Sequence, residues 1–181
     1  MRNVRSIAGL LRDERGSAAV EFSVVVPIML TLFFGVVEFS SGIAVDRKVT
    51  LVARTLSDLT SQSSCVTQTD LDGFLATGKA IMAPYSTTPL VSTVSQVYVD
   101  DNLDAKVKWS KGSAPRGNDS TVSIPAGLKV KGTYLIMAEV EYLYVPVGIG
   151  YVMKANINLK EQTYTRPRQS ASVVFKTSSC A

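Results

Sequence analysis

The stretch ERGSAAVEFSVVVPIMLTLFFGVVEFSSGIAV, residues 14–45, contains no charged side chain between Phe22 and Val37. An α-helix rises about 1.5 Å per residue, so roughly 20 residues cross a hydrocarbon core of about 30 Å. The segment from Ala18 to Val37 has that length, and charged or polar residues mark both ends of the stretch. We therefore predict that residues 17–45 form a single membrane-spanning helix.

The segment before this helix is basic, with four arginines and two acids in its first fifteen residues. A secretory signal peptide has a small-residue cleavage site after its apolar region. Here the candidate cleavage site, between Gly16 and Ser17, comes before the apolar region. Cleavage there would remove residues 1–16 as a leader peptide and leave Glu21 as the fifth residue of the mature chain. Cleavage among the small residues that follow Phe39 is the weaker alternative.

Two groups of residues resemble a known family. The first consists of Gly16-Ser17-Ala18-Ala19-Val20-Glu21-Phe22, Pro27 and the segment FGVVEF at residues 34–39, and a weaker echo is TYTRPR at residues 163–168. The pattern resembles the class III signal of type IV pilins and, more closely, the TadE/TadF-like pseudopilins of the Flp (tight adherence) pilus system. The resemblance implies a prepilin peptidase that cuts after Gly16. It also implies that the partners include other pilins, pseudopilins and the pilus assembly machinery.

The resemblance also implies a function and a location. A protein of this family is a minor pilin or pseudopilin that takes part in pilus assembly, adhesion and surface attachment. It is a single-pass protein of the bacterial inner membrane, with a cytoplasmic N-terminus and a periplasmic C-terminal domain, or it is extracellular as part of the pilus. The family's position-five glutamate neutralises the N-terminal amine of a neighbouring subunit, which implies an assembly role for Glu21. By its position alone, Glu21 is equally an acid favoured by the helix dipole, an effect of about 0.3–1 kcal/mol.

One face of the predicted span is rich in small and polar residues. They recur at steps of four and three residues, which places them on one stripe of the helix. Small residues let helix backbones approach closely in lipid, although they are also ordinary in membrane helices. Pro27 is expected to kink or loosen the helix. We predict a helix-packing face formed by Ala19, Ser23, Pro27, Thr31, Gly35, Glu38 and Gly42.

The helix is predicted to continue beyond the membrane as an amphipathic stalk over residues 46–63. Its apolar residues recur at steps of four and three, which is the spacing of one buried helix face. That face contains Val45, Val49, Val52, Leu56 and Leu59, whereas Arg47, Thr50, Arg54, Ser57 and Asp58 point the other way and Leu51 lies off the apolar stripe. The alternative is a separate juxtamembrane helix that lies on the lipid surface.

Residues 64–181 are predicted to form one extracytoplasmic α+β domain, because roughly 120 residues are enough for one modest core. A helix is expected to begin at 67–71 and to stop before Pro84, and alternating segments predict strands. The strands are expected at residues 91–99, 105–110, 122–124, 129–144, 156–164 and 171–175. The predicted fold is pilin-like, with the long N-terminal helix packed on a small antiparallel sheet of four or five strands.

Cys65 and Cys180 are the two cysteines of the sequence. A bridge between them would close a loop of more than 100 residues, which in the chain-entropy model contributes about 4–5 kcal/mol. One cysteine follows the predicted stalk and the other lies near the C-terminus, so we predict that they are joined. The alternative is a pair of buried free thiols. An oxidising location for the domain fits the bridge, and long C-terminal domains cross the membrane largely regardless of flanking charge.

The sequence argues against catalysis. Histidine is absent, and no nucleophile elbow, P-loop or dinucleotide fingerprint occurs,. Glu139 and Glu141 would share one face of a strand, where solvated acids are common. The acids at residues 100, 101 and 104 lack the spacing of an EF-hand, and turn chemistry accounts for them.

A net charge of +4 is too small and too scattered to indicate nucleic-acid binding,. We therefore expect no enzymatic activity, no metal, no cofactor and no nucleic-acid partner, with the lipid bilayer as a partner of the span. If the leader is retained, the alternative is an uncleaved, single-pass anchored binding module that presents its domain to an envelope partner.

Overall fold

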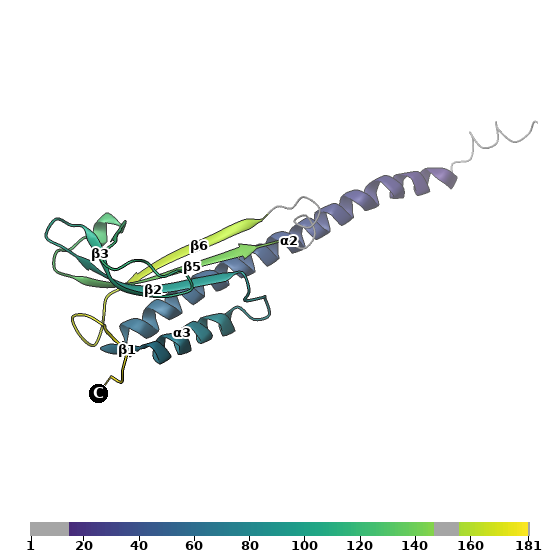
Figure 1. Ribbon diagram of the computed structural model, residues 1–181. Coiled ribbons are helices and arrows are strands. Elements are labelled where there is room, and N and C mark those ends of the chain that lie inside the picture. Colours follow the sequence, from purple (N-terminus) through teal and green to yellow (C-terminus); the bar gives the residue numbers. More distant parts are fainter. Residues whose placement is uncertain (1–14, 147–155, 181) are drawn as a thin grey trace, which may run out of the picture. The chain divides into compact units, whose positions relative to one another are not determined.

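The structure, a computed structural model, describes residues 15–146 and 156–180 and has the predicted α+β fold class (Figure 1). Its contacts divide the chain between Ser41 and Gly42 into two units. The elements are α2 (Arg15–Ser61), β1 (Cys65–Thr67), α3 (Gln68–Ile81), β2 (Leu90–Val99), β3 (Ala105–Gly112), β4 (Thr121–Val122), the short 3-10 helix η1 (Ala126–Leu128), β5 (Tyr134–Tyr144), β6 (Ile157–Thr165) and β7 (Val174–Lys176).

The first unit is the apolar half of α2. This helix is long and apolar enough to cross a membrane, and none of its most apolar part is buried within the chain. Large apolar side chains along it are exposed, among them Phe22, Phe33 and Phe39. A continuous apolar surface of this kind marks contact with lipid or with other chains, so it supports membrane anchoring.

The second half of α2 is the central helix of the second unit. The predicted apolar stripe is confirmed for Val45, Val49, Val52 and Leu56, which are at most 1% exposed, whereas Leu59 is only half-buried. This burial against the sheet contradicts a separate helix lying on the lipid surface.

The outward placement predicted for Ser57 is wrong. Ser57 is fully buried, and its hydroxyl donates a hydrogen bond of 2.7 Å to Oγ1 of Thr165 on β6. Ser57 follows Leu56 directly, and the face of α2 that packs against the sheet is broad enough to include both residues. A buried hydroxyl with a hydrogen-bond partner is tolerated there.

Helix α3 begins where the sequence predicts. Thr67 is its N-cap and forms a capping box with Asp70, whose carboxylate accepts the Thr67 backbone N–H at 2.9 Å. At the other end, Nζ of Lys48 on α2 donates to the carbonyl oxygens of Ile81 and Ala83 at 2.8 and 2.7 Å. A cation at a helix C-terminus satisfies carbonyls that have no partner within the helix. The lysine therefore ties α3 to α2.

The main sheet has five antiparallel strands in the order β4-β3-β2-β5-β6. The second half of α2 and helix α3 lie along one of its faces (Figure 1), where the larger core includes Val94, Ile136 and Val140. A smaller core on the opposite face is centred on Val107 and Met137. The hairpin of β2 and β3 is confirmed, and its register shifts between Gln96 and Val97.

Two strand predictions need correction. The strand expected over 129–144 begins only at Tyr134, because a turn occupies the residues before it and Gly132 has a φ of 73°. The last strand, expected at the sheet edge over 171–175, is β7, which pairs in parallel with β1 in a separate two-stranded sheet. A three-residue strand such as β1 has too little periodicity to be predicted. Most of the segment between the strands predicted at 129–144 and 156–164 lies outside the described residues.

Candidate functional site

The proposed processing site lies at the start of α2. Gly16 and Ser17 are within the helix, which begins at Arg15. Glu21 follows one turn later and is exposed, and it has no hydrogen bond or ion pair with any other residue that the structure describes.

The space around the predicted helix-packing face differs between Gly35 and Gly42. A Cβ added to Gly35 would meet nothing within 4 Å, so the helix surface is open to a close neighbour there. Pro27 lies inside the helix and cannot donate a backbone hydrogen bond,. Its carbonyl oxygen also accepts the hydroxyl of Thr31 at 2.8 Å. At Gly42, an added Cβ would lie 3.6 Å from Cε1 of Tyr144, so this position faces the chain's own sheet.

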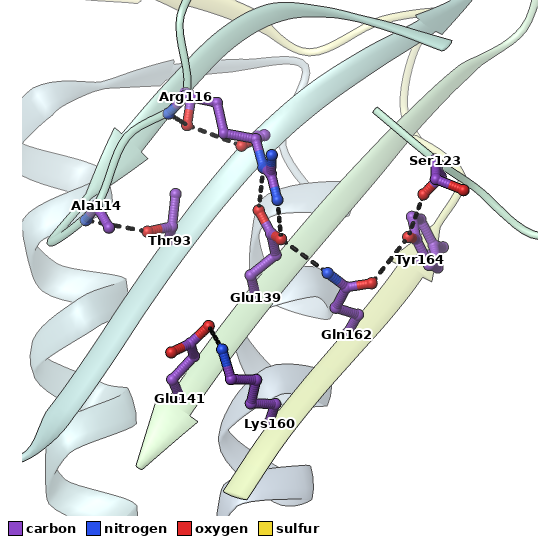
Figure 2. Close-up of polar contacts among 11 residues, drawn as sticks. Thr93, Ala114, Arg116, Ser123, Glu139, Glu141, Lys160, Gln162 and Tyr164 are labelled. Carbon is purple, nitrogen blue, oxygen red and sulfur yellow. Dashed lines mark hydrogen bonds and ion pairs between the residues drawn. The ribbon is translucent and has the colours of Figure 1, made fainter. Parts of the chain in front are cut away.

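A polar network covers the sheet face opposite the helices (Figure 2). Arg116, from the loop after β3, donates from Nε and Nη2 to the two carboxylate oxygens of Glu139, each at 2.6 Å. Gln162 on β6 donates to the same carboxylate at 2.8 Å. The Arg116 backbone N–H donates to Oγ of Ser110 at 2.9 Å, and the Ala114 N–H donates to Oγ1 of Thr93 at 3.2 Å. These bonds hold the loop after β3 against the sheet.

The two acids of β5 differ in their surroundings. The side chain of Glu141 is 46% exposed and pairs with Lys160 at 2.7 Å, as expected for a solvated face. The side chain of Glu139 is only 15% exposed. Hydrogen bonds from the Arg116 guanidinium hold the pKa of Glu139 below its usual value, although burial acts in the opposite direction. The expectation of a solvated face thus holds for Glu141 and is wrong for Glu139.

The aspartates after β2 form a turn. The Asp100 carboxylate accepts the backbone N–H groups of Asn102 and Asp104 at 3.0 and 2.9 Å and pairs with Lys106 at 2.8 Å. The hydrogen bond from Lys106 lowers the pKa of Asp100. Turn chemistry therefore accounts for these acids. Within the described part of the chain, no three metal-ligating side chains gather into a group that could hold an ion.

The C-terminal segment is fixed to the core by its backbone. The Val173 N–H donates to Oε1 of Gln96 at 2.6 Å, and the Val173 carbonyl accepts the indole N–H of Trp109 at 2.8 Å. All three residues are buried. Sequence reasoning missed this clamp and the role of Arg116, since nothing local in the sequence indicates partners that lie 23 to 77 residues away.

The echo motif at residues 163–168 lies against the end of α2. Thr165 accepts the hydrogen bond from Ser57, the Arg168 guanidinium pairs with Asp58, and the Arg168 N–H donates to the carbonyl of Ser61 at 2.8 Å. The motif therefore satisfies one of the free carbonyls at the helix C-terminus.

The predicted disulfide between Cys65 and Cys180 is present. It follows the pairing of β1 with β7, in which Cys65 lies opposite Val174. The bridge therefore fastens the C-terminal strand beside the end of the stalk.

Comparison with known proteins identifies the N-terminal helix. The family model of TadE-like proteins matches residues 16–57. No curated protein and no solved structure matches the chain. The match begins at the proposed cleavage site and covers α2 almost to its end, but it does not include the sheet. Residues 16–57 are therefore similar to the TadE-like family, as the sequence resemblance predicts.

Proposed function

We propose that this protein is a minor pilin or pseudopilin that takes part in assembly of an Flp-type pilus and, through it, in adhesion and surface attachment. In this proposal a prepilin peptidase cuts between Gly16 and Ser17, and the mature chain joins other pilins and the assembly machinery. The TadE-like match that starts at residue 16 carries the proposal. The exposed apolar surface of α2 supports it, because an assembling helix must be available to lipid and to neighbouring helices,.

The proposed location is the bacterial inner membrane, with the N-terminus in the cytoplasm and residues 64–181 outside it. The apolar half of α2 supports anchoring in a membrane. The disulfide supports an oxidising compartment for the domain,. We further propose that the protein has no catalytic activity and acts as a structural component, as the absence of histidine and of catalytic motifs from the sequence favours,.

Glu21 gives the sharpest test of this function. A carboxylate at the membrane edge is costly unless it has a partner, and the amine of Ser17 in a neighbouring mature subunit would supply one. In a strain that lacks the wild-type protein, Glu21→Gln should be cleaved and inserted normally but should abolish pilus assembly, measured as pilin in the sheared surface fraction.

Phe22→Leu is the control for the Glu21 test, because it changes the adjacent side chain and keeps the charge. It should assemble as the wild type does. Normal pilus yield from Glu21→Gln, with the variant present in the membrane at wild-type level, would contradict the proposed assembly role.

A further inference from the structure

One end of the sheet lies beside Gly42. This residue opens the second unit and follows Ser41, the last residue of the apolar unit. Tyr144 ends β5 and lies close to Gly42, since a Cβ added to Gly42 would be 3.6 Å from its Cε1, and Tyr144 pairs with Ile157 at the start of β6. The last residues of β5 and the first of β6 therefore lie beside Gly42, the residue at which the second unit begins.

Exposed apolar side chains gather at this end of the second unit. Ile43, Leu143, Val145 and Ile157, which we call the membrane-proximal patch, are 40 to 48% exposed. The hydrogen bond from the Leu143 N–H to the carbonyl of Pro89 shows that the loop before β2 reaches the same end. Among the other described residues of this unit, the exposed large apolar ones are spread singly over separate elements, as on an ordinary soluble surface,. The concentration of apolar surface at one end indicates a partner there.

Basic groups flank the membrane-proximal patch. Arg47 is exposed, one and a half turns beyond Gly42 on α2,. Lys79 is exposed in the last turn of α3, and the bonds from Lys48 to the end of α3 bring that turn to the same end. The nearby acids are Asp46 beside Arg47 and Glu141, which pairs with Lys160. Basic side chains beside apolar ones suit a surface with phosphate groups above hydrocarbon.

We propose that the membrane-proximal patch docks on the lipid bilayer, with Leu143, Val145 and Ile157 at the boundary of headgroups and acyl chains. Arg47 and Lys79 then lie among the lipid phosphates. The occupant is lipid because the patch is beside the residue at which the chain emerges from the apolar helix, and because its flanking charges complement anionic headgroups. The proposal requires membrane anchoring of α2 and is independent of the role in pilus assembly.

The test uses the full-length protein in nanodiscs of phosphatidylcholine and phosphatidylglycerol, with one chain per disc. A single cysteine added as Leu143→Cys, Val145→Cys or Ile157→Cys carries a nitroxide label, while Cys65 and Cys180 remain bonded. Collisions of the label with oxygen, which enriches in lipid, and with a nickel chelate, which stays in water, report the depth of the label. If one of the three cysteine variants does not fold or cannot be labelled, the other two still report the depth of the patch.

Val130→Cys is the matched control. Val130 is 44% exposed, like the patch residues, but it lies in the turn before β5. The eleven residues of β5 separate it from the patch by roughly 35 Å,. Labels on the patch should collide with the nickel chelate about threefold less often than the Val130 label, and more often with oxygen, as expected 5–10 Å into the interface.

Equal nickel accessibility at the patch and at Val130 would overturn the proposal. Protection of the patch in discs with two chains, but not in discs with one, would also overturn it, because a second copy would then be the occupant. Unchanged pilus assembly would not affect this result, since the readout is the depth of the label.

Discussion

Glu139 connects the loop after β3 to two strands of the sheet through a single carboxylate. Its hydrogen bonds with Arg116 lower the pKa of this group in the folded protein. A carboxyl whose folded pKa lies below its unfolded value, about 4.3 for Glu, stabilises the folded state above the unfolded pKa. That contribution is lost as the pH falls through the folded value. The stability of the domain should therefore depend on pH through this residue in the acidic range.

Glu139→Gln should lower stability at neutral pH by about 1 kcal/mol, after allowance for the partial exposure of Arg116. In a chain of this length, this corresponds to a fall of about 2–4 °C in melting temperature. The difference from the wild type should be constant from neutral pH down to about pH 5 and should shrink below that. Thermal unfolding in detergent across this range measures it.

Glu141→Gln is the control at the residue scale, since it removes an exposed ion pair on the same face of the same strand. Such pairs contribute about 0–1 kcal/mol, so the expected change is small. Equal losses from the two variants at neutral pH would show that the network around Glu139 has no special importance.

At the scale of elements, the contact between α3 and α2 depends on one of the two glycines of α3. An added Cβ at Gly78 would lie 3.1 Å from Cγ1 of Val52, whereas a Cβ at Gly73 would meet nothing within 4 Å. Gly73→Ala should therefore stabilise the protein by about 0.5–1 kcal/mol, because alanine is the better helix former. Gly78→Leu should destabilise it by about 1–3 kcal/mol, because the core is overpacked.

The glycine prediction is measured by the melting temperatures of the two variants beside the wild type. The melting temperature should rise for Gly73→Ala and fall for Gly78→Leu. A loss of stability from Gly73→Ala, or a wild-type melting temperature for Gly78→Leu, would mean that the packing of α3 on α2 is described wrongly.

Elements with strong periodicity could be predicted from the sequence, and the contacts between distant elements could not. The stripe of Val45, Val49, Val52 and Leu56 predicted the buried face of α2, because burial recurs at the helical period,. The alternation of apolar and polar residues predicted strands β2, β3, β5 and β6 for the corresponding reason, that burial in a strand recurs at every second residue. Ser57 was predicted to be exposed because hydropathy patterning assigns a polar side chain to the solvent face. Its hydrogen-bond partner, Thr165, lies 108 residues away in the sequence, so no local pattern could indicate that Ser57 is buried.

In the candidate site, too, local motifs could be predicted from the sequence and contacts between distant residues could not. The motif from Gly16 to Phe22 is local, so the sequence alone predicted the match of residues 16–57 to the TadE-like family. The cleavage site stays a prediction. The network of Arg116, Glu139 and Gln162 depends on the register of three separate segments, and no local pattern specifies that register. The parallel pairing of β1 with β7 is likewise set by contacts more than 100 residues apart.

For the whole molecule, the disulfide decides whether the C-terminal segment stays on the domain. Without it, the segment keeps the backbone bonds of Val173, the short pairing of β7, the packing of Phe175 beside Trp109 and the contacts of Arg168. Replacing both Cys65 and Cys180 by serine should lower stability by about 2–4 kcal/mol. Hydrogen exchange and trypsin cleavage after Lys176 should both become faster, while exchange in β2 and β5 should change much less.

Reduced wild-type protein is the matched comparison for the serine variant, and the two should behave alike. Identical cleavage rates after Lys176 in the oxidised wild type and the serine variant would show that the bridge is not needed to hold the segment.

The central claim is that the apolar helix remains as the N-terminus of a membrane protein after its basic leader is removed. The intact mass of the protein, purified from membranes of cells that contain the prepilin peptidase, tests this claim most directly. We predict the mass of a chain that begins at Ser17, and the mass of the full chain when the peptidase is absent. A full-length mass in the presence of the peptidase would contradict the claim and would favour an uncleaved, anchored binding module.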